Sequence, residues 1–199
     1  MVIVAFGAHP DDVEFGAFGT LAKLRDKHDV YIVVMTSGEI TGDPDERRLE
    51  ADASGKLIDA NVSVLDYRDG DIPVNGEIID VIRTYIDEKN PDIVFTHHLD
   101  DTHQDHRNTS HIVTSACSQV PLFLYYEVPS TKRFAPNYFY DVTDTFEVKR
   151  RAMRCHKTQE HKPWFDLDEV EGLARYRAYN CEKKSRLYEG FMLGKKVIK

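Results

Sequence analysis

Residues 2–14 read VIVAFGAHPDDVE, and this stretch determines the fold class that the chain is expected to adopt. Its first part, Val2–Ala5, is a short apolar run, which is typical of a strand. A run that is apolar throughout suits a parallel sheet covered on both faces, because neither face then meets water. A histidine and three carboxylates follow within six residues, in Ala8–Glu14. The stretch therefore predicts a parallel sheet with polar chemistry at the carboxyl end of its first strand.

The rest of the chain repeats this alternation of strand and helix. Further strand-like runs are Val30–Met35, Val62–Leu65, Ile93–Phe95, Leu122–Val128 and Tyr138–Val142. Apolar residues three and four apart predict amphipathic helices over Phe15–Lys27, Asp45–Ala60, Glu77–Lys89, Asn108–Ser118, Asp144–His156 and Asp168–Leu187. There is no internal repeat, linker or low-complexity segment. We therefore expect one domain over residues 1–199, a Rossmann-like three-layer α/β/α fold with a mostly parallel open sheet.

Composition narrows the possible environments and partners. The 199 residues are 41% hydrophobic, and no apolar run approaches the roughly 18 residues of a membrane-spanning helix. The N-terminus lacks the basic segment and cleavage site of a signal peptide, so we expect a cytoplasmic protein. The formal charge of −8 disfavours a nucleic-acid partner. The three widely spaced cysteines, Cys117, Cys155 and Cys181, predict reduced and mostly buried thiols.

A run of basic residues interrupts this acidic background: Lys149, Arg150, Arg151, Arg154, Lys157 and Lys162. Such a run is usually a solvated helix face. If it flanks a binding pocket, it would suit a phosphate or carboxylate on the ligand.

The segment after the first strand has two possible interpretations. Pro10 disfavours helix at His9 and keeps this imidazole in the loop, whereas Asp11 and Asp12 fall where a helix begins. The aspartates could simply cap that helix, since carboxylates there accept backbone N–H bonds. Alternatively, His9 and Asp12 bind one metal ion while Asp11 points toward whatever the metal activates.

A second cluster favours the metal. After the fourth predicted strand the chain reads THHLDDTHQDH over Thr96–His106, with four histidines and three aspartates in ten residues. Three ligands from His and Asp, with one open position for water, make a hydrolytic zinc site. His9, Asp12 and one histidine of this loop would supply three ligands. The same set also fits non-haem Fe²⁺, so the ligands alone select neither the metal nor the reaction.

These motifs resemble those of the PIG-L/LmbE-like family of metal-dependent N-deacetylases, which has an AHPDD(x)E segment after the first strand and a later HxDH segment. Both are present, at Ala8–Glu14 and at His103–His106. Thr36–Glu39 is similar to the family's TxGE turn, and Arg47–Glu50 to its RxxE helix. Asp141–Gln159 resembles a stretch ending in H-S-Q, although Thr158 replaces the serine.

The resemblance implies a role for each of the central residues. It makes His9, Asp12 and His106 the metal ligands. Asp11 would be the general base that takes a proton from water. His103 would stabilise the oxyanion and supply a proton to the departing amine.

Two further residues would position these groups. Asp105 would orient an imidazole, and Arg47 would hold Asp11 or the substrate. The implied substrate is an N-acetylglucosamine-type sugar or conjugate, with Zn²⁺ (or Fe²⁺) as cofactor and a homo-oligomeric assembly. The alternatives are hydrolysis of a different amide or an acyl ester, and a non-catalytic metal-stabilised binding module.

Overall fold

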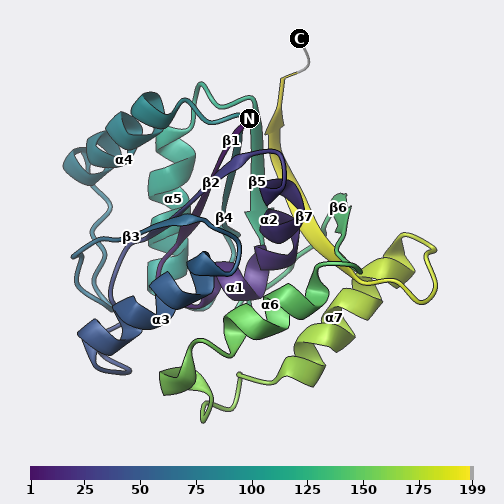
Figure 1. Cartoon of the computed structure of the whole chain (residues 1–199). Coiled ribbons are helices and arrows are strands. Elements are labelled where there is room, and N and C mark those ends of the chain that lie inside the picture. Colours follow the sequence, from purple (N-terminus) through teal and green to yellow (C-terminus); the bar gives the residue numbers. More distant parts are fainter. Residues whose placement is uncertain (198–199) are drawn as a thin grey trace.

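A seven-stranded sheet forms the centre of the computed structural model, which describes residues 1–197 (Figure 1). The strand order is β3-β2-β1-β4-β5-β7-β6. The parallel strands are β1 (Val2–Gly7), β2 (Asp29–Val34), β3 (Asn61–Val64), β4 (Ile93–His97) and β5 (Leu122–Tyr126). β7 (Tyr188–Lys196) runs antiparallel to both β5 and β6 (Tyr138–Asp141). The prediction of a mostly parallel open sheet is confirmed.

Helices cover both faces of this sheet (Figure 1). α4 (Gly76–Lys89) and α5 (Gln104–Ala116) pack on one face. The opposite face carries α1 (Asp12–Gly16), α2 (Phe18–Arg25), α3 (Pro44–Lys56) and α6 (Phe146–Met153). The 3₁₀ helix η1 (Lys157–Gln159) follows α6, and α7 (Leu167–Asn180) packs beside β7. None of the helices described is both long and apolar enough to cross a membrane.

The first strand shows why its sequence is apolar at every position. Ile3 and Ala5 belong to the core beneath α1 and α2, whereas Val4 and Phe6 belong to the core beneath α4 and α5. All four side chains are fully buried. Because alternate side chains of a strand point to opposite faces, a strand between two helical layers needs apolar residues on both.

The order of the strands also determines where the polar segments meet. From β1 the chain proceeds outward through β2 and β3, and then crosses back so that β4 lies on the other side of β1. The direction of winding therefore reverses between β1 and β4. In open α/β sheets, ligands bind beyond the carboxyl ends of the strands at such a reversal. The HPDD segment follows β1 and the histidine-rich segment follows β4, so both lie at this position.

The structure differs from the sequence prediction in three elements. The helix predicted over Asp168–Leu187 ends at Asn180. The helix predicted over Phe15–Lys27 is divided at Ala17, which has a φ of −142°, into α1 and α2. The strand β7 was not predicted, since Tyr188–Lys196 contains two glycines and no β-branched residue.

All three cysteines are free, as predicted, but only Cys117 is buried.

Two neighbouring residues of α4 test how this helix packs on the sheet. Ile82 is 1% exposed in the core between α4 and the sheet, whereas its neighbour Val81 is 48% exposed. Ile82→Ala leaves a cavity and should lower the free energy of unfolding by about 2–5 kcal/mol. Val81→Ala should change it by no more than about 0.5 kcal/mol. Urea denaturation of both variants measures this difference, and equal losses would contradict the assigned face of α4.

Candidate metal centre and active site

The loop after β1 has a strained backbone. Asp11 adopts a φ of 114°, which residues other than glycine rarely do. Its side chain caps no N–H of α1; instead, Asp12 Oδ2 accepts a hydrogen bond from the His9 N–H at 2.7 Å. The interpretation of these aspartates as a simple helix cap is therefore wrong. Strain of this kind is concentrated at functional sites, and here it turns the side chains of Asp11 and Asp12 to different partners.

The predicted ligand set lies together around Asp12. The Oδ1 atom of Asp12 lies 3.3 Å from Nε2 of His106, and its Oδ2 atom lies 3.5 Å from Nδ1 of His9. The ring centres of His9 and His106 are 5.4 Å apart. All three residues are at most 9% exposed. Burial raises the pKa of Asp12, but the two imidazoles of His106 and His97 outweigh it and hold this pKa well below its usual value.

Three groups of side chains in the described part of the chain have the geometry to hold a metal ion. They are His9 with His103 and His106, Asp12 with His97 and His106, and His9 with Asp69 and Asp105. In each group the ligand atoms lie within 4.8 Å of one another. The predicted ligands are divided among these groups: the first contains His9 and His106, the second contains Asp12 and His106, and none contains all three.

Two of these residues were not singled out from the sequence. His97 ends β4, is fully buried, and places Nε2 3.1 Å from both Asp12 Oδ2 and the Ala8 N–H. Its place in the histidine-rich segment was the available signal. Asp69 lies between β3 and α4, and its Oδ1 atom is 3.0 Å from His9 Nε2. No pattern in the surrounding sequence marks it.

Asp105 contacts an imidazole, as the resemblance implies, and that imidazole is His9. Its Oδ2 atom lies 3.3 Å from His9 Nε2 and accepts the Gly70 N–H at 2.6 Å. Burial lowers the pKa of His9, but the hydrogen bonds to Asp105, Asp12 and Asp69 outweigh it and raise this pKa well above its usual value. Asp105 thereby fixes the ring orientation of His9 and joins the start of α5 to the loop before α4.

His106 is held from its other side. Its Nδ1 atom lies 3.3 Å from Asp101 Oδ1 and 3.1 Å from the Ser130 hydroxyl. A carboxylate on the far nitrogen is the arrangement that orients metal-binding histidines. Burial lowers the pKa of His106, yet the charge of Asp12 and the hydrogen bonds to Asp101 and Asp12 outweigh it and raise this pKa to about 9. Because Asp101 and Ser130 contact Nδ1, the Nε2 atom of His106 is the one directed toward Asp12.

Asp11 is held by Arg47. The Arg47 guanidinium lies 3.3 Å from Asp11 Oδ2, donates to the Pro10 carbonyl at 2.6 Å, and also donates to the Gly38 carbonyl at 3.0 Å. Burial raises the pKa of Asp11 to about 7, against the opposing effect of Arg47. Gly38 has a φ of +70°, and a Cβ there would lie 2.0 Å from the guanidinium. The turn after β2 therefore needs glycine so that Arg47 can reach the HPDD loop.

The Arg47–Glu50 helix also holds the HKTQ segment. The Glu50 carboxylate accepts the N–H of Thr158 at 2.8 Å and its hydroxyl at 2.6 Å. A serine would offer the same hydroxyl, so the substitution at this position preserves the contact. Nearby, the fully buried His156 places Nε2 3.3 Å from Glu14, the last carboxylate of the first motif.

His103 completes the cluster at the start of α5. Its Nδ1 atom accepts the Asp105 N–H at 3.3 Å, which leaves the proton of the neutral ring on Nε2. Its ring centre is 4.8 Å from that of His9 and 4.6 Å from that of His106. Burial and the neighbouring His106 and His9 lower the pKa of His103. The ring is therefore neutral at pH 7 and can donate a hydrogen bond.

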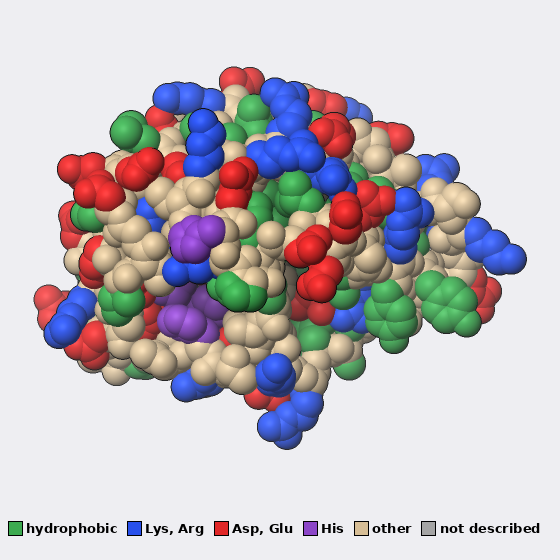
Figure 2. Space-filling model, turned by 90° about the horizontal axis from the view of Figure 1, so that it is seen from below, with side chains coloured by type: hydrophobic (Ala, Val, Ile, Leu, Met, Phe, Trp, Pro, Cys, Tyr) green, Lys and Arg blue, Asp and Glu red, His purple; other side chains and the backbone are tan. Residues whose placement is uncertain are grey.

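A cavity of about 510 Å³, which we call the metal cavity, lies at this site. Its polar wall includes His9, Asp11, Asp12, Arg47, Asp69, His103 and His106. This volume lies within the range of about 300–1,000 Å³ that is usual for ligand pockets. Figure 2 shows histidine side chains in a hollow on this face of the molecule. The apolar part of the wall comprises Phe15, Ile40, Val128, Pro129 and Trp164.

The basic run does not form one face. Lys149 is buried and pairs with Glu189 at 2.6 Å, whereas Lys162 lines the metal cavity. Arg151, Arg154 and Lys157 are exposed. The interpretation of the whole run as a solvated face is therefore wrong for Lys149, and only Lys162 is placed to contact a ligand in the metal cavity.

Known proteins are similar to this chain in sequence and in fold. Residues 4–117 match the model of the PIG-L family, described as GlcNAc-PI de-N-acetylase. The uncharacterized deacetylase YaiS of Escherichia coli (strain K12) is 35% identical over 169 residues, which cover 78% of this chain and 90% of that protein. The N,N′-diacetylchitobiose deacetylase of Pyrococcus horikoshii is 25% identical with a TM-score of 0.84, over 96% of this chain and 83% of that one.

A third likeness concerns the fold alone. The 4-carboxy-2-hydroxymuconate hydratase GalB of Pseudomonas putida KT2440 has a TM-score of 0.86 at 18% identity, over 100% of this chain and 98% of that one. The fold therefore hosts more than one reaction, and the reaction must be argued from the site. The family model spans more than half of the chain and includes both motifs of the site. This chain belongs to the PIG-L family.

Proposed function

We propose that this protein is a zinc-dependent N-deacetylase that removes the acetyl group from an N-acetylglucosamine-type sugar or conjugate. The observation that carries the proposal is the position of Asp11. Its buried carboxylate lines the metal cavity beside the candidate ligands. Because Arg47 holds it rather than a ligand imidazole, Asp11 would be free to accept a proton from a water molecule. Membership of the PIG-L family and the likeness to the Pyrococcus deacetylase of an acetylated disaccharide support this reaction and substrate class.

The donor set fits a divalent cation. His9, Asp12 and His106 would hold it, and two imidazoles with one carboxylate suit Zn²⁺ or Fe²⁺. Three buried carboxylates, those of Asp11, Asp12 and Asp69, line the metal cavity, and a fourth, that of Asp105, contacts His9. A cation bound here would balance negative charge. When bound, the ion would polarise the acetyl carbonyl and make a water molecule more acidic.

The other side chains would carry the protons. Asp11 would take a proton from water as the water oxygen attacks the amide carbon. The N–H at Nε2 of His103 would donate a hydrogen bond to the carbonyl oxygen as negative charge develops on it. As the C–N bond breaks, Asp11 would pass the proton that it took from water to the nitrogen, while neutral His103 keeps its hydrogen bond to the oxygen, so that acetate and a free amine leave.

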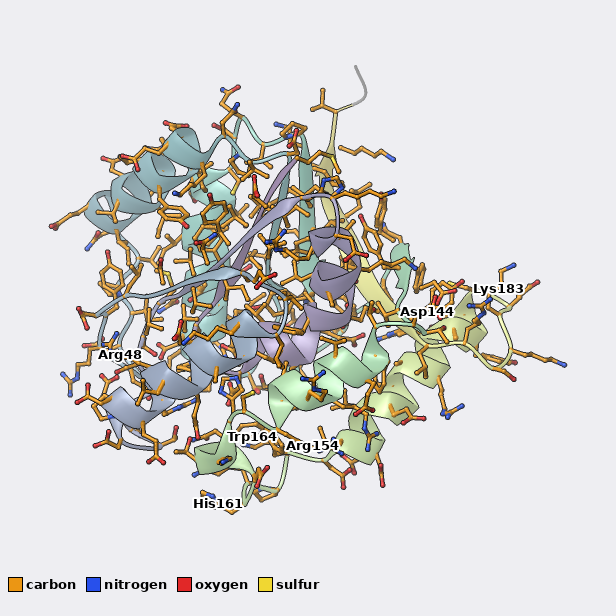
Figure 3. The ribbon with its side chains drawn as sticks, viewed as in Figure 1. Arg48, Asp144, Arg154, His161, Trp164 and Lys183 are labelled. Carbon is orange, nitrogen blue, oxygen red and sulfur yellow. The ribbon has the colours of Figure 1, made fainter. Side chains whose placement is uncertain are left out.

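Replacing Asp11 tests the assignment of the base. Asp11→Asn removes the proton acceptor but keeps the side-chain size, so kcat should fall by about 10²–10⁴-fold while bound zinc remains. Amine release from a panel of N-acetylglucosamine compounds, with zinc content by elemental analysis, measures both. Asp144→Asn is the control, because Asp144 is exposed and lies away from the metal cavity (Figure 3). Full turnover by Asp11→Asn would mean that Asp11 is not the base, whereas no amine release by the unmodified zinc-loaded protein would favour a binding module without catalysis.

Replacing His106 tests the ligand set. His106→Ala removes one candidate metal ligand and one imidazole partner of the buried Asp12. Bound zinc per chain should fall well below that of the unmodified protein, and activity should be lost with it. A chelator should abolish the activity of the unmodified protein, and added zinc should restore it. Elemental analysis after dialysis gives the metal content, and retention of a full equivalent by His106→Ala would remove His106 from the set.

Replacing Arg47 tests whether this residue lowers the pKa of Asp11. Its guanidinium lowers the pKa of Asp11, so removing it raises that pKa. Since Asp11 must be deprotonated to accept a proton, the acid limb of kcat/KM should move to higher pH in Arg47→Met. Arg47→Lys keeps the charge and should leave the limb closer to that of the unmodified protein. Initial rates from pH 5 to 9 measure the shift, and a limb that stays in place would mean that Arg47 does not act through Asp11.

A further inference from the structure

A second cavity of about 380 Å³ adjoins the metal cavity, and nothing in the proposed reaction uses it. The two cavities share four wall residues: Phe15, Val128, Pro129 and Trp164. Beyond them, the second cavity runs between α7 and β7, with Leu173 and Ala174 on one side and Gly190 on the other. A ligand that occupies the metal cavity can therefore extend past Trp164 into this space.

The shared wall is aromatic and partly open. Trp164 is 39% exposed, and its ring packs at 64° against that of Phe15, with the centroids 5.5 Å apart. Figure 3 shows Trp164 in the segment between α6 and α7. An exposed indole face gives a large apolar contact area, which suits the apolar face of a sugar ring. Trp164 is also the only tryptophan in the sequence, so its fluorescence reports on this wall alone.

The charges of the second cavity select against anions. Its two cations are already paired, because Lys149 lies 2.6 Å from Glu189 and Arg177 lies 2.6 Å from Glu127. Asp166 and Glu169 are exposed at its edge. Within the described residues, neither has a basic partner within ion-pair distance. In the part of the chain that the structure describes, Asp166 accepts only the backbone N–H groups of Asp168 and Glu169. A phosphate group placed here would meet two carboxylates without basic partners, which disfavours phosphorylated or nucleotide-linked ligands.

A lipid chain fits no better. The cavity wall carries six charged side chains among its apolar residues, and a hydrocarbon chain would remove several of them from water without giving hydrogen bonds in return. Hydroxyl groups can both donate to carboxylates and accept from guanidinium or ammonium groups. A ring with one apolar face and several hydroxyls matches the combination of Trp164 with these charged groups.

We propose that the second cavity is a subsite for a second, non-anionic sugar ring, linked to the acetylated sugar whose acetamide lies in the metal cavity. The substrate is then a neutral disaccharide or longer oligosaccharide rather than a phosphorylated monosaccharide. This inference rests on the proposed function for the ring in the metal cavity. Contacts to the second ring lie away from the reacting atoms, and binding energy gained there can support both affinity and turnover.

Binding can be measured without turnover in the zinc-loaded Asp11→Asn protein through the fluorescence of Trp164. Three probes are titrated: N-acetylglucosamine, N,N′-diacetylchitobiose and N-acetylglucosamine 1-phosphate. The disaccharide should bind about tenfold or more tightly than the monosaccharide, with a larger change in emission. The phosphate should bind no more tightly than the monosaccharide. Equal affinity for mono- and disaccharide, or tightest binding of the phosphate, would overturn the proposal.

Variants of α7 locate the effect. Leu173 is 40% exposed, so Leu173→Arg should fold while it fills the second cavity. The kcat/KM ratio of disaccharide to monosaccharide should then fall to about one. Glu169→Lys should reverse the charge preference and tighten binding of the phosphate probe. Tyr179→Ala is the matched control, since Tyr179 lies on the same helix, is 77% exposed and is not part of the second cavity. The control should keep the ratio of the unmodified protein.

The two proposals fail in different ways. If no probe releases an amine but the disaccharide still binds more tightly and loses this advantage in Leu173→Arg, the proposed reaction is wrong and the subsite stands. If both sugars are deacetylated at the same kcat/KM and Leu173→Arg leaves their ratio unchanged, the proposed reaction stands and the subsite is wrong.

Discussion

The carboxylate of Asp12 joins three segments that are distant in the sequence. It accepts the N–H of His9 at 2.7 Å, and its oxygens lie 3.1 Å from Nε2 of His97 and 3.3 Å from Nε2 of His106. These contacts connect the loop after β1 to the end of β4 and the first turn of α5. They are possible because the sheet places β1 beside β4 at the reversal of strand order. A buried carboxylate needs such partners, since an unpaired one would cost several kcal/mol.

The other aspartates around Asp12 differ in whether they contact an imidazole or a guanidinium. Asp69, Asp101 and Asp105 each contact the edge of an imidazole and so fix how His9 and His106 are turned. Within residues 1–197, Asp11 has no imidazole in ion-pair distance and is instead held by Arg47 from α3. Its pKa of about 7 follows from burial that Arg47 only partly offsets. Neighbouring aspartates of the same motif thus have opposite pKa shifts because their partners differ.

The sequence was sufficient to predict the parts of this arrangement that depend on local pattern. The apolar run at Val2–Ala5 predicted a strand covered on both faces, and the two polar motifs predicted where the sheet would bind a ligand. Asp69 could not be found in this way, because it reaches His9 only through the path of the loop between β3 and α4. The contact of His156 with Glu14 likewise joins segments far apart in the sequence, so only the fold reveals it. β7 was missed because its pairing with β5 and β6 outweighs a weak intrinsic preference for strand.

The position of β7 has a consequence for the order in which the chain can fold. β6 pairs only with β7 among the described strands, and β7 also covers the edge of β5. Glu189 on β7 accepts the N–H groups of Gly19 and Thr20 in α2 and neutralises the buried Lys149 of α6. During synthesis, β5 therefore keeps an open edge, and Lys149 lacks its counter-ion, until β7 emerges. The nascent chain carries an unpaired strand edge through the synthesis of α6 and α7, and such an edge favours aggregation.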